Sequence, residues 1–278
     1  MEKEAMDDWD DQEASHAFLS SLKKGDGVAV RDDLYEFQLL LDAVKLTRRK
    51  GIPFRLIDSG TLDIFRLEWL ANEGAAVCSS DRAPRSLQEL ERVGKACKRG
   101  GAFLSFFHHA SLASKNGMTA IDLSGLMSLA AEGVYIFISS KEEKRNLGQL
   151  CALADRCRRG RSWLVYYHHG RLEENLVELA RNGAWIHIAD SGLGGEAAEH
   201  VLLLDVTGAA LASEANLVLH LNAEMEFYQL NDIQKAGAFL LFHSPLLDYR
   251  SPLKPLKEKA SNQKLDPKAF YLYSKFFF

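Results

Sequence analysis

The chain has 278 residues, of which 47% are hydrophobic and 26% are charged, which is an ordinary composition for a soluble globular protein with a sizeable core. Its formal net charge of −4 argues against nucleic-acid binding as the main function. No apolar run approaches the roughly 20 residues that a membrane span needs. The acidic start, MEKEAMDDWDDQE, does not resemble a secretory signal. We therefore expect a cytoplasmic protein with neither a nucleic-acid nor a membrane partner.

The first 33 residues precede the regular part of the sequence. They contain an acidic leader, a short helix candidate at 17–22 and a short strand candidate at 28–30. The first long helix is predicted over 34–50, where apolar residues recur at helical spacing and the last turn is basic, as suits a helix C-terminus. Whether the strand at 28–30 belongs to the main sheet is left open by the pattern.

After residue 50, apolar strand candidates alternate with helices of about three turns. The strands are nearly continuous apolar runs rich in aromatic and β-branched residues, which is typical of a parallel sheet that is buried on both faces. Eight such candidates follow one another, at 54–59, 75–80, 102–109, 134–140, 162–169, 184–190, 217–222 and 238–244.

A fourfold internal repeat organises these elements. In each copy a leucine-rich helix ends at a glycine and an apolar strand begins at the next residue. The four segments are LEWLANEGAAV (67–77), LMSLAAEGVYI (126–136), LVELARNGAWI (176–186) and LNDIQKAGAFL (230–240). A repeated supersecondary unit dictates the fold. Four βαβα units predict a closed (βα)₈ TIM-like barrel over 34–245, with an open doubly wound sheet as the alternative.

The last segment, 246–278, departs from the repeat. It carries prolines, lysines and an aromatic end, KAFYLYSKFFF. We expect it either to pack across one end of the barrel or to form a homo-oligomer contact, because so much exposed aromatic surface is unusual on a monomer.

Histidines gather at the C-terminal ends of the predicted strands, which is where barrel enzymes place their active sites. Aligning the copies LIDSGTL, FFHHASL and YYHHGRL makes Asp58, His108 and His168 equivalent, with His220 as the counterpart in the fourth copy. Asp190 comes from an alternate strand. We predict that these five residues converge on one mouth and carry the chemistry.

Two kinds of chemistry suit this set. Imidazoles in a low-dielectric pocket can hold Zn²⁺ or a similar divalent ion that activates water, with His108, His168 and His220 as the ligands. Without a metal, the histidines can serve as general acid and base, because histidine titrates near neutral pH. Asp58 and Asp190 would then orient or ligate. Alternatively, the histidine pairs are duplicated packing elements.

A glycine loop lies directly before a predicted helix in the sequence DSGLGGEAAEH (190–200). Backbone N–H groups exposed by Gly192, Gly194 and Gly195 could hold an anionic group at the helix start. The spacing matches neither dinucleotide nor P-loop fingerprints, so a flexible connection is the alternative.

Together these features predict a cytoplasmic barrel enzyme of hydrolase or lyase type, acting on a small polar substrate, with a phosphorylated compound as one alternative. The absence of a dinucleotide fingerprint disfavours redox chemistry. The rival interpretation is a non-catalytic barrel that serves as a binding or scaffolding module through its acidic leader and aromatic tail.

Overall fold

A computed structural model of the chain describes residues 27–109, 112, 121–190, 193, 196–221 and 227–242. The predictions for the acidic leader, the aromatic tail and the anion-binding glycines Gly192, Gly194 and Gly195 lie outside the described residues. The chain divides into two compact units. Unit 1 contains Met1–Phe107 and Asn116–Ile121, and unit 2 contains His108–Lys115 and Asp122–Phe278.

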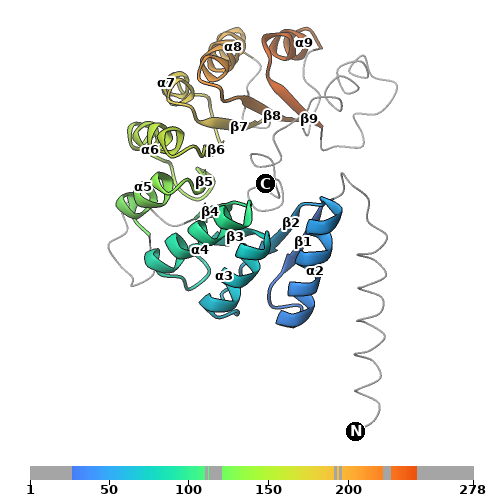
Figure 1. Cartoon of the computed structure of the whole chain (residues 1–278). Coiled ribbons are helices and arrows are strands. Elements are labelled where there is room, and N and C mark those ends of the chain that lie inside the picture. Colours follow the sequence, from blue (N-terminus) through green and yellow to red (C-terminus); the bar gives the residue numbers. More distant parts are fainter. Residues whose placement is uncertain are drawn as a thin grey trace. The chain divides into compact units, whose positions relative to one another are not determined.

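Unit 1 is built from parallel strands that pair in sequence order. Strand β1 pairs with β2 at Val28↔Phe54, and β2 pairs with β3 at Arg55↔Ala76. Strand β3 pairs with β4. Three helices connect the strands and lie beside them (Figure 1). The elements are β1 (Val28–Arg31), α2 (Phe37–Lys50), β2 (Phe54–Ile57), α3 (Ile64–Glu73), β3 (Ala76–Ser80), α4 (Leu87–Gly100) and β4 (Leu104–His108), whose last residue already belongs to unit 2.

Unit 2 repeats the arrangement with five strands, again parallel and paired in sequence order. Neighbouring helices pack against one another, most closely α7 against α8 and α5 against α6. The elements are α5 (Leu123–Ala131), β5 (Tyr135–Ser139), α6 (Leu147–Arg159), β6 (Leu164–His168), α7 (Asn175–Arg181), β7 (Trp185–Ala189), α8 (Ala197–Ala212), β8 (Leu217–Leu221), α9 (Phe227–Ala236) and β9 (Phe239–Phe242).

This order confirms the predicted fold class. Strands and helices alternate, the strands are parallel, and within each unit each strand pairs with the next along the chain, which is the order of an α/β barrel. The reversal of strand order that defines a doubly wound sheet does not occur within either unit. The described residues carry nine strands rather than eight, because the short candidate at 28–30 is a true strand, β1, paired with β2.

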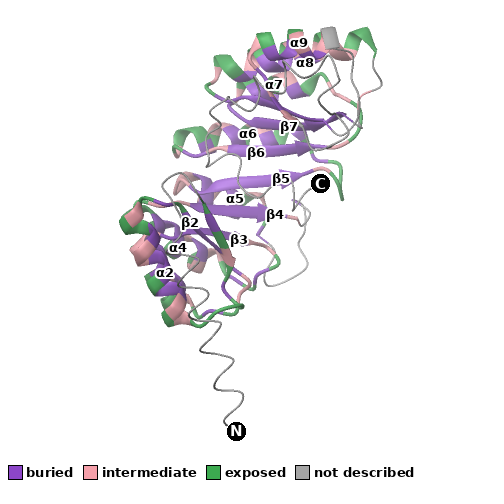
Figure 2. Ribbon diagram, turned by 90° about the vertical axis from the view of Figure 1, so that its right-hand side faces the viewer, coloured by how far each residue is buried: buried purple, intermediate pink, exposed green. Residues whose placement is uncertain are grey.

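The strands form the core of each unit. Every residue of β5, β6, β7 and β8 is buried, so both faces of these strands are covered, as the continuous apolar runs predict. Figure 2 shows the strands as buried ribbons and the helices as exposed on their outer sides. The buried thiols of Cys78, Cys97 and Cys157 have pKa values raised by burial to about 12, so they are protonated and unreactive at neutral pH.

The repeated glycines end their helices in the same way. Gly74 has a left-handed φ of 114°, its N–H donates to the Ala71 carbonyl, and the N–H of Ala75 donates to the Leu70 carbonyl. These two bonds form a Schellman motif, which satisfies the last-turn carbonyls and turns the chain straight into the next strand. The same pair of bonds recurs at Gly133, Gly183 and Gly237, each with positive φ. This backbone requirement explains why glycine persists in all four copies.

A second set of small residues lets consecutive helices approach closely. A Cβ on Gly160, which follows α6, would lie 2.0 Å from the Ala130 carbonyl oxygen of α5. In the preceding copy a Cβ on Gly100 would lie 2.1 Å from the Ala71 carbonyl oxygen. In the next copy Ser213 occupies the corresponding place, and its hydroxyl donates to the Ala180 carbonyl over 2.7 Å.

Replacing Gly160 with alanine is therefore expected to lower the free energy of unfolding by about 1–3 kcal/mol, because a backbone carbonyl must move. The matched control is Gly208→Ala in the interior of α8, where a Cβ meets no atom within 4 Å. There the better helix propensity of alanine should raise stability by up to about 1 kcal/mol. Chemical denaturation of both variants measures the difference, and effects of the same sign would contradict the packing argument.

Candidate functional site

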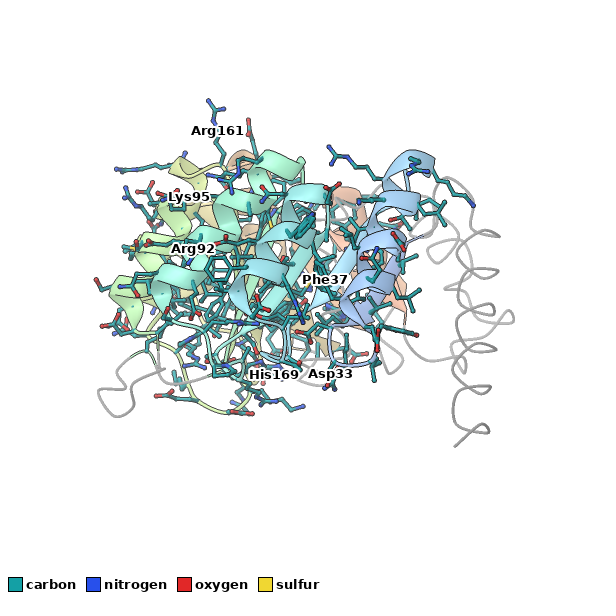
Figure 3. The ribbon with its side chains drawn as sticks, turned by 60° about the horizontal axis from the view of Figure 1, so that its bottom comes forward. Asp33, Phe37, Arg92, Lys95, Arg161 and His169 are labelled. Atoms are coloured by element: carbon teal, nitrogen blue, oxygen red, sulfur yellow. The ribbon has the colours of Figure 1, made fainter. Side chains whose placement is uncertain are left out.

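A cavity of about 370 Å³ opens at the C-terminal ends of β5 and β6 in unit 2. Its size is that of a small-molecule site. The lining combines strand-end residues with residues of the two loops that follow these strands. They are Ser140, Lys144, Arg145, Tyr166, His168, His169, Arg171 and Glu173. Within unit 2, Figure 3 shows His169, which follows β6, at the opposite end from Arg161, which precedes it.

The charges in the cavity are unbalanced. Lys144, Arg145 and Arg171 contribute three cations, whereas Glu173 contributes the one carboxylate of the lining. Lys144 and Glu173 form an ion pair of 2.8 Å, with the lysine side chain 79% exposed. Within the lining three cations face one carboxylate even when the histidines are neutral, so the cavity suits an anionic ligand.

Arg145 is fixed in the wall of this cavity. Its side chain is only 2% exposed. Its Nε donates to the Ser139 carbonyl over 2.9 Å, and one terminal nitrogen donates to the His109 carbonyl over 3.3 Å. The other terminal nitrogen contacts the half-exposed carboxylate of Glu143 at 3.1 Å. Two backbone carbonyls thus set the plane of the guanidinium.

His168 has a defined tautomer. It is the last residue of β6 and is buried. Its Nε2 lies 2.8 Å from the carbonyl oxygen of Arg171, and since a carbonyl only accepts, Nε2 carries the proton. Nδ1 is buried and has no hydrogen-bond partner among the residues that the structure describes. Burial lowers the pKa of His168 below its ordinary value, so the ring is neutral at pH 7 with a lone pair on Nδ1.

Hydroxyl groups stand beside this imidazole. The rings of Tyr166 and His168 lie 5.9 Å apart, centroid to centroid. Burial raises the pKa of Tyr166, and a hydrogen bond with the Ser140 side chain opposes that shift. Ser140 also accepts from the backbone N–H of His169 over 2.8 Å, which ties the end of β5 to the end of β6. Tyr166 therefore remains a protonated phenol at neutral pH.

Only one of the five predicted catalytic residues, His168, lines this cavity. His108 is fully buried at the end of β4. Asp190 is buried directly after β7, and its carbonyl accepts from the N–H of Leu193 over 2.9 Å. The predicted roles of His108 and Asp190 stay predictions.

His220 belongs to a different cluster in the core of unit 2. Its Nε2 lies 2.9 Å from Nδ1 of His187, so one ring donates to the other, and both rings are buried. The Tyr167 ring packs 4.3 Å from the His187 ring. This cluster is buried between strands rather than open to the cavity, and we interpret His220 as a core residue bonded to His187.

Asp58 is engaged within unit 1. Arg85 contacts both of its carboxylate oxygens, at 2.8 and 3.1 Å, and Ser79 donates to it over 2.7 Å. The N–H of Gly60 donates to it over 3.0 Å. With its oxygens occupied in this way, Asp58 is better explained as the counter-ion of Arg85 than as a ligand or orienting group for histidines.

The predicted metal ligands His108, His168 and His220 do not form a ligand group in the structure. Among the described residues, no cluster of three or more His, Cys, Asp or Glu side chains is arranged to hold a metal ion. The metal therefore stays a prediction.

Arg145 was not among the predicted site residues, because the prediction considered only the ends of the strands. The repeat nevertheless contains a signal for this arginine. SSDRAPRS (79–86) and SSKEEKRN (139–146) align without gaps, and both place an arginine directly before the N-cap residue of the next helix. Comparing loops as well as strand ends would have found Arg85 and Arg145.

Comparisons with known proteins give no family. No protein-family model matches the chain, and no curated protein matches it. Nor does any helix in the described part of the chain combine the length and apolarity needed to cross a membrane.

Several solved structures resemble it weakly. One is a protein assigned as a fructose-1,6-biphosphate aldolase from Coccidioides immitis, with 13% identity, a TM-score of 0.35, and coverage of 81% of this chain and 85% of that one. A mandelate racemase/muconate lactonizing protein from Herpetosiphon aurantiacus has 14% identity and a TM-score of 0.37, with 81% of this chain and 56% of that one covered. A citrate synthase variant has 10% identity and a TM-score of 0.34, with 75% and 94% covered. At these values the likeness assigns no activity or substrate.

Proposed function

We propose that the chain is an enzyme of hydrolase or lyase type that acts on a small polar anionic substrate in the unit 2 cavity. The substrate's negative charge would be held by Lys144, Arg145 and Arg171, and His168 would move a proton. The cytoplasmic location and the homo-oligomer stay predictions.

The tautomer of His168 is the observation that carries the proposal. A buried acceptor left without a donor costs about 1–3 kcal/mol, so folding alone does not favour this arrangement. The Arg171 carbonyl fixes the proton on Nε2 and leaves Nδ1 as the basic atom on a side chain that lines the cavity. A fixed tautomer with an unprotonated ring nitrogen at neutral pH is what a general base requires.

Tyr166 complements His168 in this proposal. Its phenol stays protonated because burial raises its pKa. It can therefore donate a proton or a hydrogen bond to a developing oxyanion while His168 accepts one. Proton abstraction and return within one cavity serve elimination as well as hydrolysis by an activated water.

A substrate panel with matched variants tests the proposal. Small phosphate esters and hydroxy acids are screened for released phosphate and for conjugated products. His168→Asn should lower kcat/KM by about 10²- to 10⁴-fold, whereas His169→Asn, the adjacent residue, should cost far less. Turnover that survives His168→Asn would refute the proposal. Ligand binding with no turnover of any compound would favour the binding-module alternative.

The pH dependence gives an independent check. A general base works in its unprotonated form, and the pKa of His168 is lowered from 6.5 by burial. We therefore expect kcat/KM to stay level as the pH falls from 8 to 6.5 and to decline only at lower pH, in the free enzyme. A decline centred above pH 6.5 would show that another group limits the rate.

A further inference from the structure

An ion pair joins the two loops that line the unit 2 cavity. Lys144 lies in the loop between β5 and α6, Glu173 lies in the loop between β6 and α7, and both side chains line the cavity. The Nζ of Lys144 is 2.8 Å from Oε1 of Glu173. The two side chains are 79% and 33% exposed, so the pair lies where the cavity meets solvent. Glu173 thus occupies a cation that an anionic ligand would otherwise use.

The lysine of this pair is not a requirement of the repeated loop. In the aligned segments SSDRAPRS (79–86) and SSKEEKRN (139–146), Lys144 takes the place of Pro84. In unit 1 the proline packs against the neighbouring loop, where a Cβ on Gly60 would lie 2.3 Å from its ring. The unit 1 loop therefore makes an apolar contact with its neighbour, whereas the unit 2 loop makes an ionic contact that a charged ligand can exchange.

The counterpart of Glu173 in unit 1 holds the start of a helix. Asp63 follows the segment LIDSGTL as Glu173 follows YYHHGRL, and its carboxylate caps α3 by accepting from the N–H of Arg66 over 3.0 Å. In unit 2 the N-cap residue of α7 is Glu174, and no side-chain bond caps this helix. The Glu173 carboxylate contacts Lys144 instead of a helix start, so its replacement should leave the fold intact.

Arg171 is a second exposed cation in the lining. Its carbonyl accepts from Nε2 of His168 over 2.8 Å, which places this residue next to the proposed base. Within the described part of the chain, no carboxylate pairs with its guanidinium. Arg145 is buried and is already engaged by two carbonyls and a carboxylate. The cations that a ligand can recruit are therefore Lys144 and Arg171.

Replacement of Glu173 by a ligand is energetically easy. An exposed ion pair contributes little stability, because water and salt screen its charges. A monoanion that takes the place of Glu173 exchanges one anion for another and gains little. A dianion also gains the contact with Arg171. The internal carboxylate therefore favours doubly charged ligands over singly charged ones.

We propose that the ligand of the unit 2 cavity is a dianion that displaces Glu173 from Lys144 and shares its second charge with Arg171. This assignment rests on the proposed function and specifies the charge of its substrate. Glu173 is then a specificity-determining residue, because it competes with the ligand for Lys144. Dicarboxylates and phosphate monoesters share the required charge.

Isothermal titration calorimetry on the full chain tests the charge of the ligand. The probes are malonate, inorganic phosphate and acetate, at pH 8 and constant ionic strength. We expect at least one of the two dianions to bind about tenfold or more tightly than acetate, and the tighter of the two identifies the group that the cavity accepts. Acetate binding as tight as that of both dianions would overturn the proposal, as would the lack of saturable binding by all three probes.

A matched pair of variants tests the competition by Glu173. Glu173→Gln should tighten binding of the preferred dianion by about two- to fivefold, because Lys144 is then released. Glu174→Gln is the control, since this exposed neighbour carries the same charge outside the cavity lining, and it should change the affinity by less than about 1.5-fold. Equal effects of the two variants would show that Glu173 acts only through its overall charge and would refute the competition.

A double-mutant cycle with Lys144 shows whether the two residues act on each other. Lys144→Gln should weaken binding of the dianion. Adding Glu173→Gln to that variant should change the affinity no more than the Glu174→Gln control does, because no lysine remains to be released. A full two- to fivefold gain that persists without Lys144 would contradict the displacement.

Failure of this inference can be told apart from failure of the proposed function, because binding is measured without turnover. Binding that ignores Glu173 and Lys144, with turnover still dependent on His168, overturns the displacement alone. Binding that follows the expected cycle, together with turnover that survives His168→Asn, overturns the catalytic role alone.

Discussion

Replacing Asp58 with alanine is expected to lower the free energy of unfolding by about 3–5 kcal/mol. This loss of stability is larger than the one we expect from any other substitution considered. The Asp58 side chain is completely buried, and its loss leaves Arg85 as an uncompensated buried cation. Ser79 and the N–H of Gly60 lose an acceptor at the same time. Urea denaturation monitored by circular dichroism measures the loss.

Two variants separate the buried pair from general effects of removing a charge. Arg66→Ala breaks an exposed pair with Asp63, whose side chains are 57% and 52% exposed, and should cost less than about 1 kcal/mol. Adding Arg85→Met to Asp58→Ala should recover part of the loss, because the orphaned charge is then gone. A cost for Asp58→Ala as small as that of Arg66→Ala would show that Asp58 is not the counter-ion we describe.

Much of the fold follows from local signals in the sequence. A helix that ends in a left-handed glycine and a strand that begins one residue later are both local events, and they recur at Gly74, Gly133, Gly183 and Gly237. Continuous apolar strands predict burial on both faces, which the structure confirms for β5 to β8. The strand Val28–Arg31 was harder to assign because four residues carry too little pattern to set a period.

The candidate site was less predictable because its partners are distant in sequence. Aligning strand ends predicted a role for both His168 and Asp58, which occupy equivalent positions in their copies. What differs is the partner, since Arg85 lies 27 residues from Asp58 and meets it only in the folded unit. A sequence pattern gives the residue at a strand end but not the group that it contacts.

Strand register explains why His220 bonds to His187, and register too is set only in the folded unit. In the β7–β8 pair, His187 lies opposite Val218 and His220 lies opposite Ala189, so the two histidines are diagonal neighbours on one face. This offset brings Nδ1 of His187 within 2.9 Å of Nε2 of His220. Without the register, the sequence could not distinguish a bonded core pair from two ligands at a mouth.

The buried histidine pair predicts that stability falls as the solution becomes acidic. Burial, and then the adjacent His220, lower the pKa of His187 well below its ordinary value of 6.5. The ring is therefore neutral in the folded chain, whereas the unfolded chain takes up a proton near pH 6.5. The contribution of His187 to stability is complete above that pH and is lost progressively as the pH falls below it, at up to about 1.4 kcal/mol per pH unit.

Replacing His187 with glutamine should flatten this dependence, since glutamine keeps hydrogen-bonding groups but does not titrate. We expect the variant to be less stable than the native chain at pH 8. At that pH His187 takes up no proton in either state, so the difference in stability reports only the altered packing and hydrogen bonding. Between pH 7 and pH 5 the variant should lose about 1–2 kcal/mol less than the native chain, because one fewer buried imidazole resists protonation. His168 and His169, whose pKa values burial also lowers, leave a residual slope in both proteins. Denaturation curves that fall in parallel from pH 7 to pH 5 would show that His187 is not the proton-linked group.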